Sequence, residues 1–494
     1  MPRLFTLLAA LLAAATAAAQ PPASVRHAAP APAEAAALCA QAAPREIRAV
    51  WLTTYGGLDW PASPAHLPQE TRAQQEALRT MLDRLQAAGI NVVLFQSRIR
   101  ATTAWESAIE PYDGVFAGST GSRPGYDPLR FAIEECHRRG MECHAWIVAF
   151  PLGKHPELAR KRPELCRRAG TDWYLNPAAP GTPAYLASLC AEVTRRYDVD
   201  GIHLDYIRYP EPAIPFRDDA EWQKADRSRY PDKRSWRAAA IDRCVQAVHD
   251  SVKALRPYVR LSCSPIGKYA DLARYSSHGW NARDAVGQHA QEWLRRGWMD
   301  MLFPMMYFDG LHFYPFLADW HEHESGRWVA PGIGIYQLSP AERDWPLEAV
   351  QRQLAVVRGL GLAGQAYYRA RFLTDDVKGL YGWLARSYYR QPALVPAMTW
   401  ADSEAPAPPK PQARREGRRL CITWPPVTDS TPVSYNVYRL DGPGAPRLCA
   451  RRLRATTYET APALPELLHC HYAVCTADAY GNESTPAVVR AVAP

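Results

Sequence analysis

Asp205 is the acidic residue of this sequence with the surroundings best suited to chemistry. It lies in the run VDGIHLDYIRYP, residues 199–210, where Ile202 and Leu204 have the parity of side chains that pack against helices. Successive residues of a strand alternate between its two faces, so His203 and Asp205 point to the opposite face. A carboxylate in that position can act as a nucleophile or stabilise a cationic transition state.

The residues that follow Asp205 are polar and aromatic. Tyr206 is its neighbour, and we expect Arg208 and Tyr209 to contact a substrate bound beside the carboxylate. The structural alternative is a buried ion pair of Asp205 with Arg208 or Arg98.

Two further acidic residues are candidates for a partner of Asp205. A pair of carboxyl groups, one an acid and one a nucleophile or base, is the arrangement that hydrolyses glycosidic bonds. Glu110 lies in the long loop after the second predicted strand, and Asp309 follows the sixth. We expect one of them to be the acid, and a solvated loop carboxylate is the alternative for both.

The same alternation places more polar and aromatic side chains on the face of Asp205. If that face forms the interior of a barrel, apolar residues would normally fill it. Burying polar side chains there costs free energy, so we expect them to have a function. Interior histidines also serve simply to satisfy hydrogen bonds, which is the alternative for two members of the set. We expect this set to bind substrate: Gln96, Arg98, His144, Trp146, His203, Tyr307, Tyr367 and Arg369.

Aromatic residues also gather in the segments predicted to cap the strand ends. They are Trp60, Trp105, Trp173, Trp280 and residues 312–316. Rings there suit stacking against sugars, and packing within the loops is the alternative.

The sequence predicts no metal site and no cofactor. His321 and His323, in the run HEHE, stand two positions apart and so do not share a helix face. With no third ligand nearby, this run is typical of a solvated helix surface.

Eight strand-like apolar runs alternate with amphipathic stretches between about residues 45 and 390. Eight such units predict an α/β fold, a (β/α)8 TIM barrel. A doubly wound sheet is the alternative, but it usually has fewer units and a glycine-rich phosphate loop. The predicted strands are 47–55, 90–99, 141–151, 200–208, 259–267, 299–307, 327–336 and 362–370.

The end of the chain differs in composition. Residues 391–411 are rich in proline and alanine, which indicates a linker. Short alternating strands at 420–424, 434–440 and 471–477 follow, within a predicted small all-β module over 412–494. This module resembles fibronectin type III, with Trp424 in place of the core tryptophan. It could bind a protein or a glycan, or only hold the barrel away from a surface.

The start of the chain predicts export. Arg3 precedes an apolar run that ends in small residues before Gln20, which is the pattern of a cleaved signal peptide over residues 1–19. No later segment is apolar enough to predict an integral membrane span. We expect the periplasm or the extracellular space, with possible association with the envelope.

Charge and composition exclude several classes of protein. The chain of 494 residues is 47% hydrophobic, with 58 basic and 50 acidic residues and a net charge of +8. It is therefore neither disordered nor fibrous. No basic run is interleaved with aromatic residues, so we expect no nucleic-acid partner.

Several motifs, in order along the barrel, resemble the bacterial glycosyl hydrolase-like 10 family. The resemblance spans about residues 45–400 and implies a (β/α)8 barrel of an exported envelope protein, related to glycoside hydrolases. Some members act on peptidoglycan glycan strands that lack stem peptides. The motifs are RAVWLTT (48–54), DWP (59–61), FQSR (95–98), IEP (109–111), PGYDPL (124–129), HAW (144–146), DGIHLDYIRYP (200–210) and PMMY (304–307).

The resemblance implies that Asp205 is the family's carboxylate on strand four. The sequence departs from the family pattern twice. Leu204 stands where many members have a second aspartate before Tyr206, and Thr102 stands where many have aspartate ahead of Glu110. These departures leave the second carboxylate open and allow a different substrate.

Together these features predict an exported glycoside hydrolase that acts on peptidoglycan glycan strands or another polysaccharide. Asp205 would be the nucleophile of a retaining mechanism or the base of an inverting one. A non-catalytic glycan-binding protein and an envelope scaffold are the alternatives.

Overall fold

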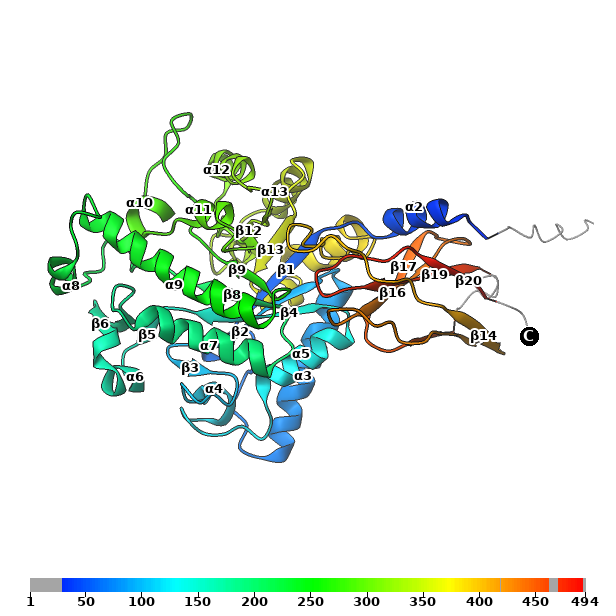
Figure 1. Ribbon diagram of the computed structural model, residues 1–494, viewed down its shortest axis with the longest axis horizontal. Helices are drawn as coiled ribbons and strands as arrows, with labels where there is room; N and C mark the ends of the chain where they lie inside the picture. Colours follow the sequence, from blue (N-terminus) through cyan, green and yellow to red (C-terminus); the bar gives the residue numbers. More distant parts are fainter. Residues whose placement is uncertain (1–28, 418, 462–469, 492–494) are drawn as a thin grey trace, which may run out of the picture.

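The computed structural model describes residues 29–417, 419–461 and 470–491, so the predicted signal peptide lies outside the described residues. Parallel strands form the central sheet, in the order β11-β10-β9-β8-β4-β2-β1-β13-β12 (Figure 1). Its uninterrupted strands are β1 (Ile47–Leu52), β2 (Val92–Ile99), β4 (Glu142–Val148), β8 (Gly201–Asp205), β9 (Arg260–Cys263), β10 (Met301–Leu302) and β13 (Gly364–Tyr368).

The seventh strand is split into two halves, and the barrel closes because each half pairs with a different neighbouring strand. Its first half, β11 (Trp328–Val329), pairs with β10, and its second half, β12 (Gly332–Ile333), pairs with β13. Pro331, between the halves, has no N–H to give to a ladder. Its carbonyl accepts from the Ala366 amide, so the chain still bridges β10 and β13. The predicted (β/α)8 barrel is confirmed.

Helices cover the outside of the barrel. In the first of them Leu78, Leu82 and Leu85 are buried, the face that the sequence predicts. The helices are α3 (Pro68–Ala87), α5 (Pro128–Arg138), α7 (Thr182–Arg196), α9 (Lys233–Leu255), α10 (Ala282–Val286), α11 (Ala290–Arg295), α12 (Gly310–Glu322), α13 (Leu347–Gly359), α14 (Ala370–Thr374) and α15 (Leu380–Trp383).

The connections after β2, β4 and β8, at the carboxyl ends of the strands, are long. The connection after β2 contains β3 (Thr102–Thr103) and α4 (Gly114–Ala117). The connection after β8 contains α8 (Asp219–Lys224). After β4 the chain forms α6 (Glu157–Lys161) and an antiparallel sheet of β5 (Pro151–Gly153), β6 (Cys166–Ala169) and β7 (Asp172–Leu175).

The C-terminal module is all-β, as predicted. Trp424 packs edge-on against Tyr435 in the core between two antiparallel sheets, with ring centroids 5.2 Å apart. One sheet has the order β14 (Gln412–Glu416), β15 (Arg419–Thr423), β18 (Thr457–Thr460). The other has the order β17 (Arg447–Leu453), β16 (Ser434–Arg439), β19 (His471–Ala477), β20 (Ala487–Arg490).

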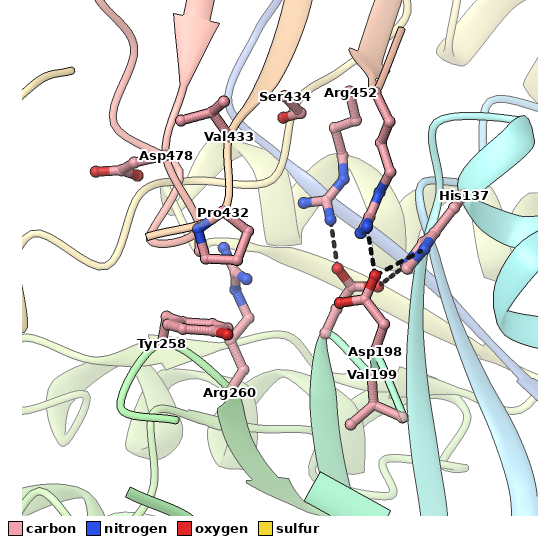
Figure 2. Close-up of a pocket in the computed structure, with 13 residues that line it drawn as sticks. His137, Asp198, Val199, Tyr258, Arg260, Pro432, Val433, Ser434, Arg452 and Asp478 are labelled. Carbon is pink, nitrogen blue, oxygen red and sulfur yellow. Dashed lines mark hydrogen bonds and ion pairs between the residues drawn. The ribbon is translucent and has the colours of Figure 1, made fainter. Parts of the chain in front are cut away.

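This module covers the amino-terminal end of the barrel, which we call the barrel floor. Arg452 on β17 donates to Glu142 Oε1 of β4 over 2.9 Å. It also donates to Asp200, which precedes β8, and Figure 2 shows Arg452 at the pocket between the module and the barrel. Asp200 also lies 2.8 Å from His137 Nε2, and Glu142 lies 3.3 Å from Arg260. The module therefore supplies a cation to two buried carboxylates of the barrel.

A helix that precedes the barrel rests on the same module. Cys39 of α2 (Pro32–Ala42) packs with Leu448 and Cys475, and α2 lies beside β17, β19 and β20 (Figure 1). Within the described ranges, none of the helices is long and apolar enough to cross a bilayer.

Candidate active site

A cavity of about 420 Å³ opens at the carboxyl ends of the barrel strands. Barrel enzymes place their active sites at this end, because the loops after the strands converge there. Side chains from seven positions of the barrel wall line it: Trp51, Gln96, Trp146, Asp205, Ser264, Tyr307 and Tyr368.

Asp205, the last residue of β8, lies in the cavity wall and is held by three donors. Its Oδ1 accepts from the Ser264 hydroxyl over 2.8 Å and from the Tyr206 amide over 2.7 Å. Its Oδ2 accepts from Trp146 Nε1 over 3.1 Å. These bonds fix the orientation of a carboxylate that is 6% exposed.

Burial raises the pKa of Asp205 above its ordinary value, even though Ser264 and the Tyr206 amide act to lower it. The charge of Arg208 also acts to lower the pKa of Asp205, but among the described residues no cation forms an ion pair with this carboxylate. A buried carboxylate without an ion pair keeps a high proton affinity.

Two tyrosine rings, Tyr307 and Tyr368, form part of the cavity wall. Tyr307 stacks on Tyr368 with ring centroids 5.4 Å apart and an interplanar angle of 27°. Tyr336 meets both rings edge-on, at 5.7 and 5.8 Å. This packing leaves a rigid aromatic surface, of the kind that fits the apolar face of a sugar.

Gln96 presents a fixed amide to the cavity. Its Oε1 accepts from the Thr53 hydroxyl over 2.7 Å and from the amides of Thr54 and Tyr55 over 3.0 and 2.7 Å. Because two backbone amides fix the oxygen, the NH2 group is left as the donor available to a ligand.

Asp172 is a second carboxylate in the lining, and the sequence analysis missed it. It begins β7, in the small sheet that follows β4, and is half-buried. Its signal in the sequence is weak, because a short hairpin inside a long loop does not reveal which side chain turns toward the barrel.

Sequence similarity places the chain in a family. The profile of a family described as glycosyl hydrolase-like 10 matches residues 46–335. The glycosyl hydrolase YngK of Bacillus subtilis is 30% identical over 89% of this chain and 92% of its own length. The chain belongs to the glycosyl hydrolase-like 10 family.

Two further comparisons were found. The glycosyl hydrolase DigH of Escherichia coli K12 is 29% identical over 62% of this chain and 77% of its own length. The catalytic domain of β-amylase from Paenibacillus polymyxa superposes with a TM-score of 0.49 at 11% identity, over 71% of this chain and 99% of that domain. The match to YngK covers more residues than the barrel holds, so it extends into the C-terminal module.

In this member of the glycosyl hydrolase-like 10 family, Glu110 is not available as an acid. Its two oxygens accept from Arg98 Nε and Nη2 over 2.8 and 2.6 Å, and from the Tyr185 hydroxyl over 2.7 Å. The side chain is 1% exposed and does not line the cavity. The structure therefore does not place Glu110 at the cavity, where the acid was expected.

Arg98 is also misplaced by the sequence analysis, and a bulge explains why. The β2–β4 register shifts between Gln96 and Arg98, so Arg98 pairs with Ile147, which packs in the helix layer. An extra residue in one strand reverses the alternation beyond it. Arg98 thus faces the helices, where it meets Glu110, and Ile99 lines the cavity instead.

Asp309 does not reach the cavity. It is exposed at the N-cap of α12, where its side chain makes no capping hydrogen bond. Tyr307, two residues earlier, is the last position of this segment that lines the cavity, so the prediction for Asp309 as the acid is wrong.

His144 and His203 face the barrel interior as predicted but lie below the cavity, so neither is placed to contact substrate. His203 accepts from Trp51 Nε1 over 3.1 Å and meets the Ser262 hydroxyl at 3.0 Å. Burial and the neighbouring His144 hold the pKa of His203 well below its usual range. His144 Nε2 lies 3.0 Å from Glu142, so both rings satisfy interior polar groups.

Arg208 and Tyr209 stand behind the cavity wall. The Arg208 guanidinium lies 4.5 Å from the ring centroid of Tyr206, which lines the cavity, so Arg208 supports a contact residue. Tyr209 packs on Phe216, with ring centroids 5.3 Å apart, and lies under Arg237. The expected substrate contacts of Arg208 and Tyr209 are not found.

On β13 the predicted parity is wrong by one residue. Tyr367 pairs with outward-facing Val50, and its hydroxyl meets that of Tyr389 in the helix layer at 2.6 Å. Tyr368, beside Trp51, lines the cavity instead. Tyr389 thus satisfies the Tyr367 hydroxyl outside the barrel interior.

Arg369 lies just beyond β13 and also does not line the cavity. Its Nη1 donates to Asp59 Oδ1 over 2.5 Å and to the Leu58 carbonyl over 2.8 Å. Asp59 in turn accepts from the Thr53 amide over 2.9 Å. Arg369 is therefore a positioning residue for the loop after β1.

The aromatic residues predicted in the loops are mostly part of the core. Trp60 and Trp105 are buried, and Trp280 is exposed and does not line the cavity. The rings that do line the cavity are Trp51, Tyr55, Trp146, Tyr206, Tyr307 and Tyr368.

One acidic cluster among the described residues could bring three ligand atoms together, within 4.8 Å. It consists of Asp319, Glu322 and His323 on and after α12. Arg274 already pairs with Glu322 at 2.8 Å, and none of the three lines the cavity. The cluster is a feature of the helix surface.

Proposed function

We propose that this chain is an exported glycoside hydrolase that cleaves O-glycosidic bonds of a bacterial envelope glycan, with peptidoglycan glycan strands as the first candidate. Membership of the glycosyl hydrolase-like 10 family supports the class of reaction. The predicted signal peptide and the family resemblance support the compartment. The observation that carries the proposal is Asp205, oriented by three donors in a cavity walled by aromatic rings.

Asp205 is the nucleophile of a retaining mechanism or the base of an inverting one in this proposal. Its three donors hold the carboxylate in one orientation toward the cavity, and its burial strengthens its interaction with an oxocarbenium-like transition state. Asp172 replaces Glu110 and Asp309 as the proposed acid, because it is the other carboxylate that lines the cavity.

The test is digestion by the purified mature chain. Denuded and intact peptidoglycan glycans and a panel of polysaccharides are incubated with it, and products are identified by mass spectrometry. We expect cleavage by the wild type, a loss of roughly 10³-fold or more in Asp205→Asn, and a loss of about 10²-fold or more in Asp172→Asn. Retained turnover in Asp205→Asn would refute the assignment.

A second candidate is a glycan-binding protein without turnover. It is favoured by one observation: Glu110, the expected acid, is locked in an ion pair with Arg98. It predicts that wild type and Asp205→Asn retain the same glycan and that neither releases products.

A further inference from the structure

A second hollow adjoins the Asp205 cavity. Its volume is about 670 Å³, and it lies over the loops that follow β2 and β4. Tyr55, Ile99, Arg100 and Gly153 line both hollows, so these four residues form the ridge between them. The two hollows are therefore neighbouring parts of one groove.

The ridge is built on a strained turn. Ile99 of β2 pairs with Thr102 of β3, which leaves Arg100 and Ala101 as the two central residues of a hairpin. Both have left-handed backbones, with φ of 54° and 59°. Such positions favour Asn-Gly, and a residue with a Cβ there costs about 1 kcal/mol. Strain of this kind is typical of functional sites.

The strained turn carries Arg100, which has no acidic partner among the residues that the structure describes. The Arg100 guanidinium lies 4.4 Å from the ring centroid of Tyr55. Opposite it is Gly153, where a Cβ would stand 2.9 Å from the Arg100 side chain, so the glycine gives the arginine room.

Acidic side chains around the second hollow are already engaged. Asp113 accepts from the Thr102 hydroxyl over 2.5 Å and from the Val115 amide over 2.8 Å. Glu157 pairs with Lys161 at 2.8 Å. Within the described ranges, neither Arg100 nor Lys154, which also lines the second hollow, has a carboxylate partner. The groove thus offers unpaired positive charge to a ligand.

We propose that the two hollows are consecutive subsites for one glycan chain and that Arg100, on the ridge, pairs with a carboxylate carried by that glycan. This inference rests on the proposed function, since it assumes that the Asp205 cavity binds sugars. It makes Arg100 a residue that determines specificity for acidic glycans of more than two sugar units. Guanidinium groups pair with carboxylates through two parallel hydrogen bonds, which suits this role.

The test measures binding to the full-length mature Asp205→Asn chain, in which a glycan is not consumed. Calorimetric titrations use glycans of two and six sugars with N-acetylglucosamine and N-acetylmuramic acid in alternation, whose lactyl group carries the carboxylate. Chitin oligosaccharides of the same lengths are the neutral control. We expect the acidic hexasaccharide to bind about tenfold more tightly than both the acidic disaccharide and the neutral hexasaccharide.

Substitutions of Arg100 distinguish the effect of its charge on glycan binding from an effect on the structure of the ridge. Arg100→Ala should lose about tenfold in affinity for the acidic hexasaccharide and keep its affinity for the neutral one, and Arg100→Lys should restore part of the preference. Arg123→Ala is the matched control, since Arg123 pairs with Glu106 in the same loop and lines neither hollow.

Two results would overturn the inference: equal affinity for two and six sugars, or equal weakening of acidic and neutral glycans by Arg100→Ala. These outcomes differ from a failure of the proposed function, in which the wild type binds glycans but releases no products. Absence of binding to every glycan would overturn both.

Discussion

Two buried carboxylates at opposite ends of the barrel, Glu142 and Asp205, differ in whether they form ion pairs. At the floor, Arg260, Arg452 and His144 hold the pKa of Glu142 below its usual value although burial acts to raise it. At the other end, burial raises the pKa of Asp205, and the groups around it do not outweigh this effect. Ion pairs favour the ionised form of Glu142, whereas burial disfavours the ionised form of Asp205.

The contrast identifies which buried charges are structural. A buried carboxylate with cationic partners has little tendency to change its protonation, so it serves folding. A buried carboxylate with only neutral donors is available for proton or bond chemistry. By this criterion Glu142, Asp200 and Glu110 are structural, and Asp205 is the candidate for chemistry.

The largest expected effect is at the floor. Arg452→Ala removes the cation shared by Glu142 and Asp200, and we expect it to lower the free energy of unfolding by about 3 kcal/mol. Arg260 and His137 remain as partners and limit the loss. Urea unfolding measures the difference, and activity at temperatures below unfolding should be unchanged.

Arg454→Ala is the control for this prediction. Arg454 also comes from the module, but its pair with Asp198 is about half exposed on both sides. We expect a change below about 1 kcal/mol. Equal losses for Arg452→Ala and Arg454→Ala would mean that the floor network is not a special source of stability.

Glu110→Gln tests a structural charge at the catalytic end. Removing this carboxylate leaves Arg98 buried without a counter-charge, so we expect a loss of about 2 to 3 kcal/mol in the free energy of unfolding. Glu106→Gln, which affects an exposed pair in the same loop, should cost less than about 1 kcal/mol. A Glu110→Gln protein with normal stability and no turnover would restore Glu110 as the acid.

Ser264→Ala should give the smallest effect, a displaced pH profile. The Ser264 hydroxyl favours the ionised form of Asp205, so its removal raises the pKa of Asp205 further. Since the proposed mechanism needs Asp205 ionised, the acidic limb of kcat/KM should move to higher pH, by about one unit. Ser262→Ala, whose hydroxyl contacts His203 instead, should leave the limb in place. Movement of the limb to lower pH would contradict the role given to Asp205.

Much of the barrel was predictable because its cues are local. Periodic apolar residues indicate strands and helices, and alternation on β8 correctly directs Asp205 inward and Ile202 outward. Alternation stops being informative where the backbone is irregular. The bulge before Arg98 exchanges the two faces of β2 for the residues that follow it. No residue type in this strand indicates the bulge from the sequence.

Long-range partners were not predictable. Nothing near Arg452 in the sequence shows that it meets Glu142, which lies 310 positions away. Tyr367 likewise has its hydroxyl partner, Tyr389, 22 positions further along the chain. Asp172 belongs to an insertion whose course is set by tertiary packing rather than by local pattern. The sequence predicted that Asp205 faces the barrel interior, but not that Asp172 lines the same cavity.

The packing of α2 on the C-terminal module has a consequence for how the protein is made. The first described helix contacts β17 and β20, which are synthesised last. Contacts between the two ends of a chain form slowly, because a long loop must close first. At about 5 to 20 residues per second, a ribosome needs tens of seconds to reach β20 after α2 has emerged. During that interval Glu142 and Asp200 lack Arg452 as an ion-pair partner. The nascent barrel therefore reaches its final stability only when the chain is complete.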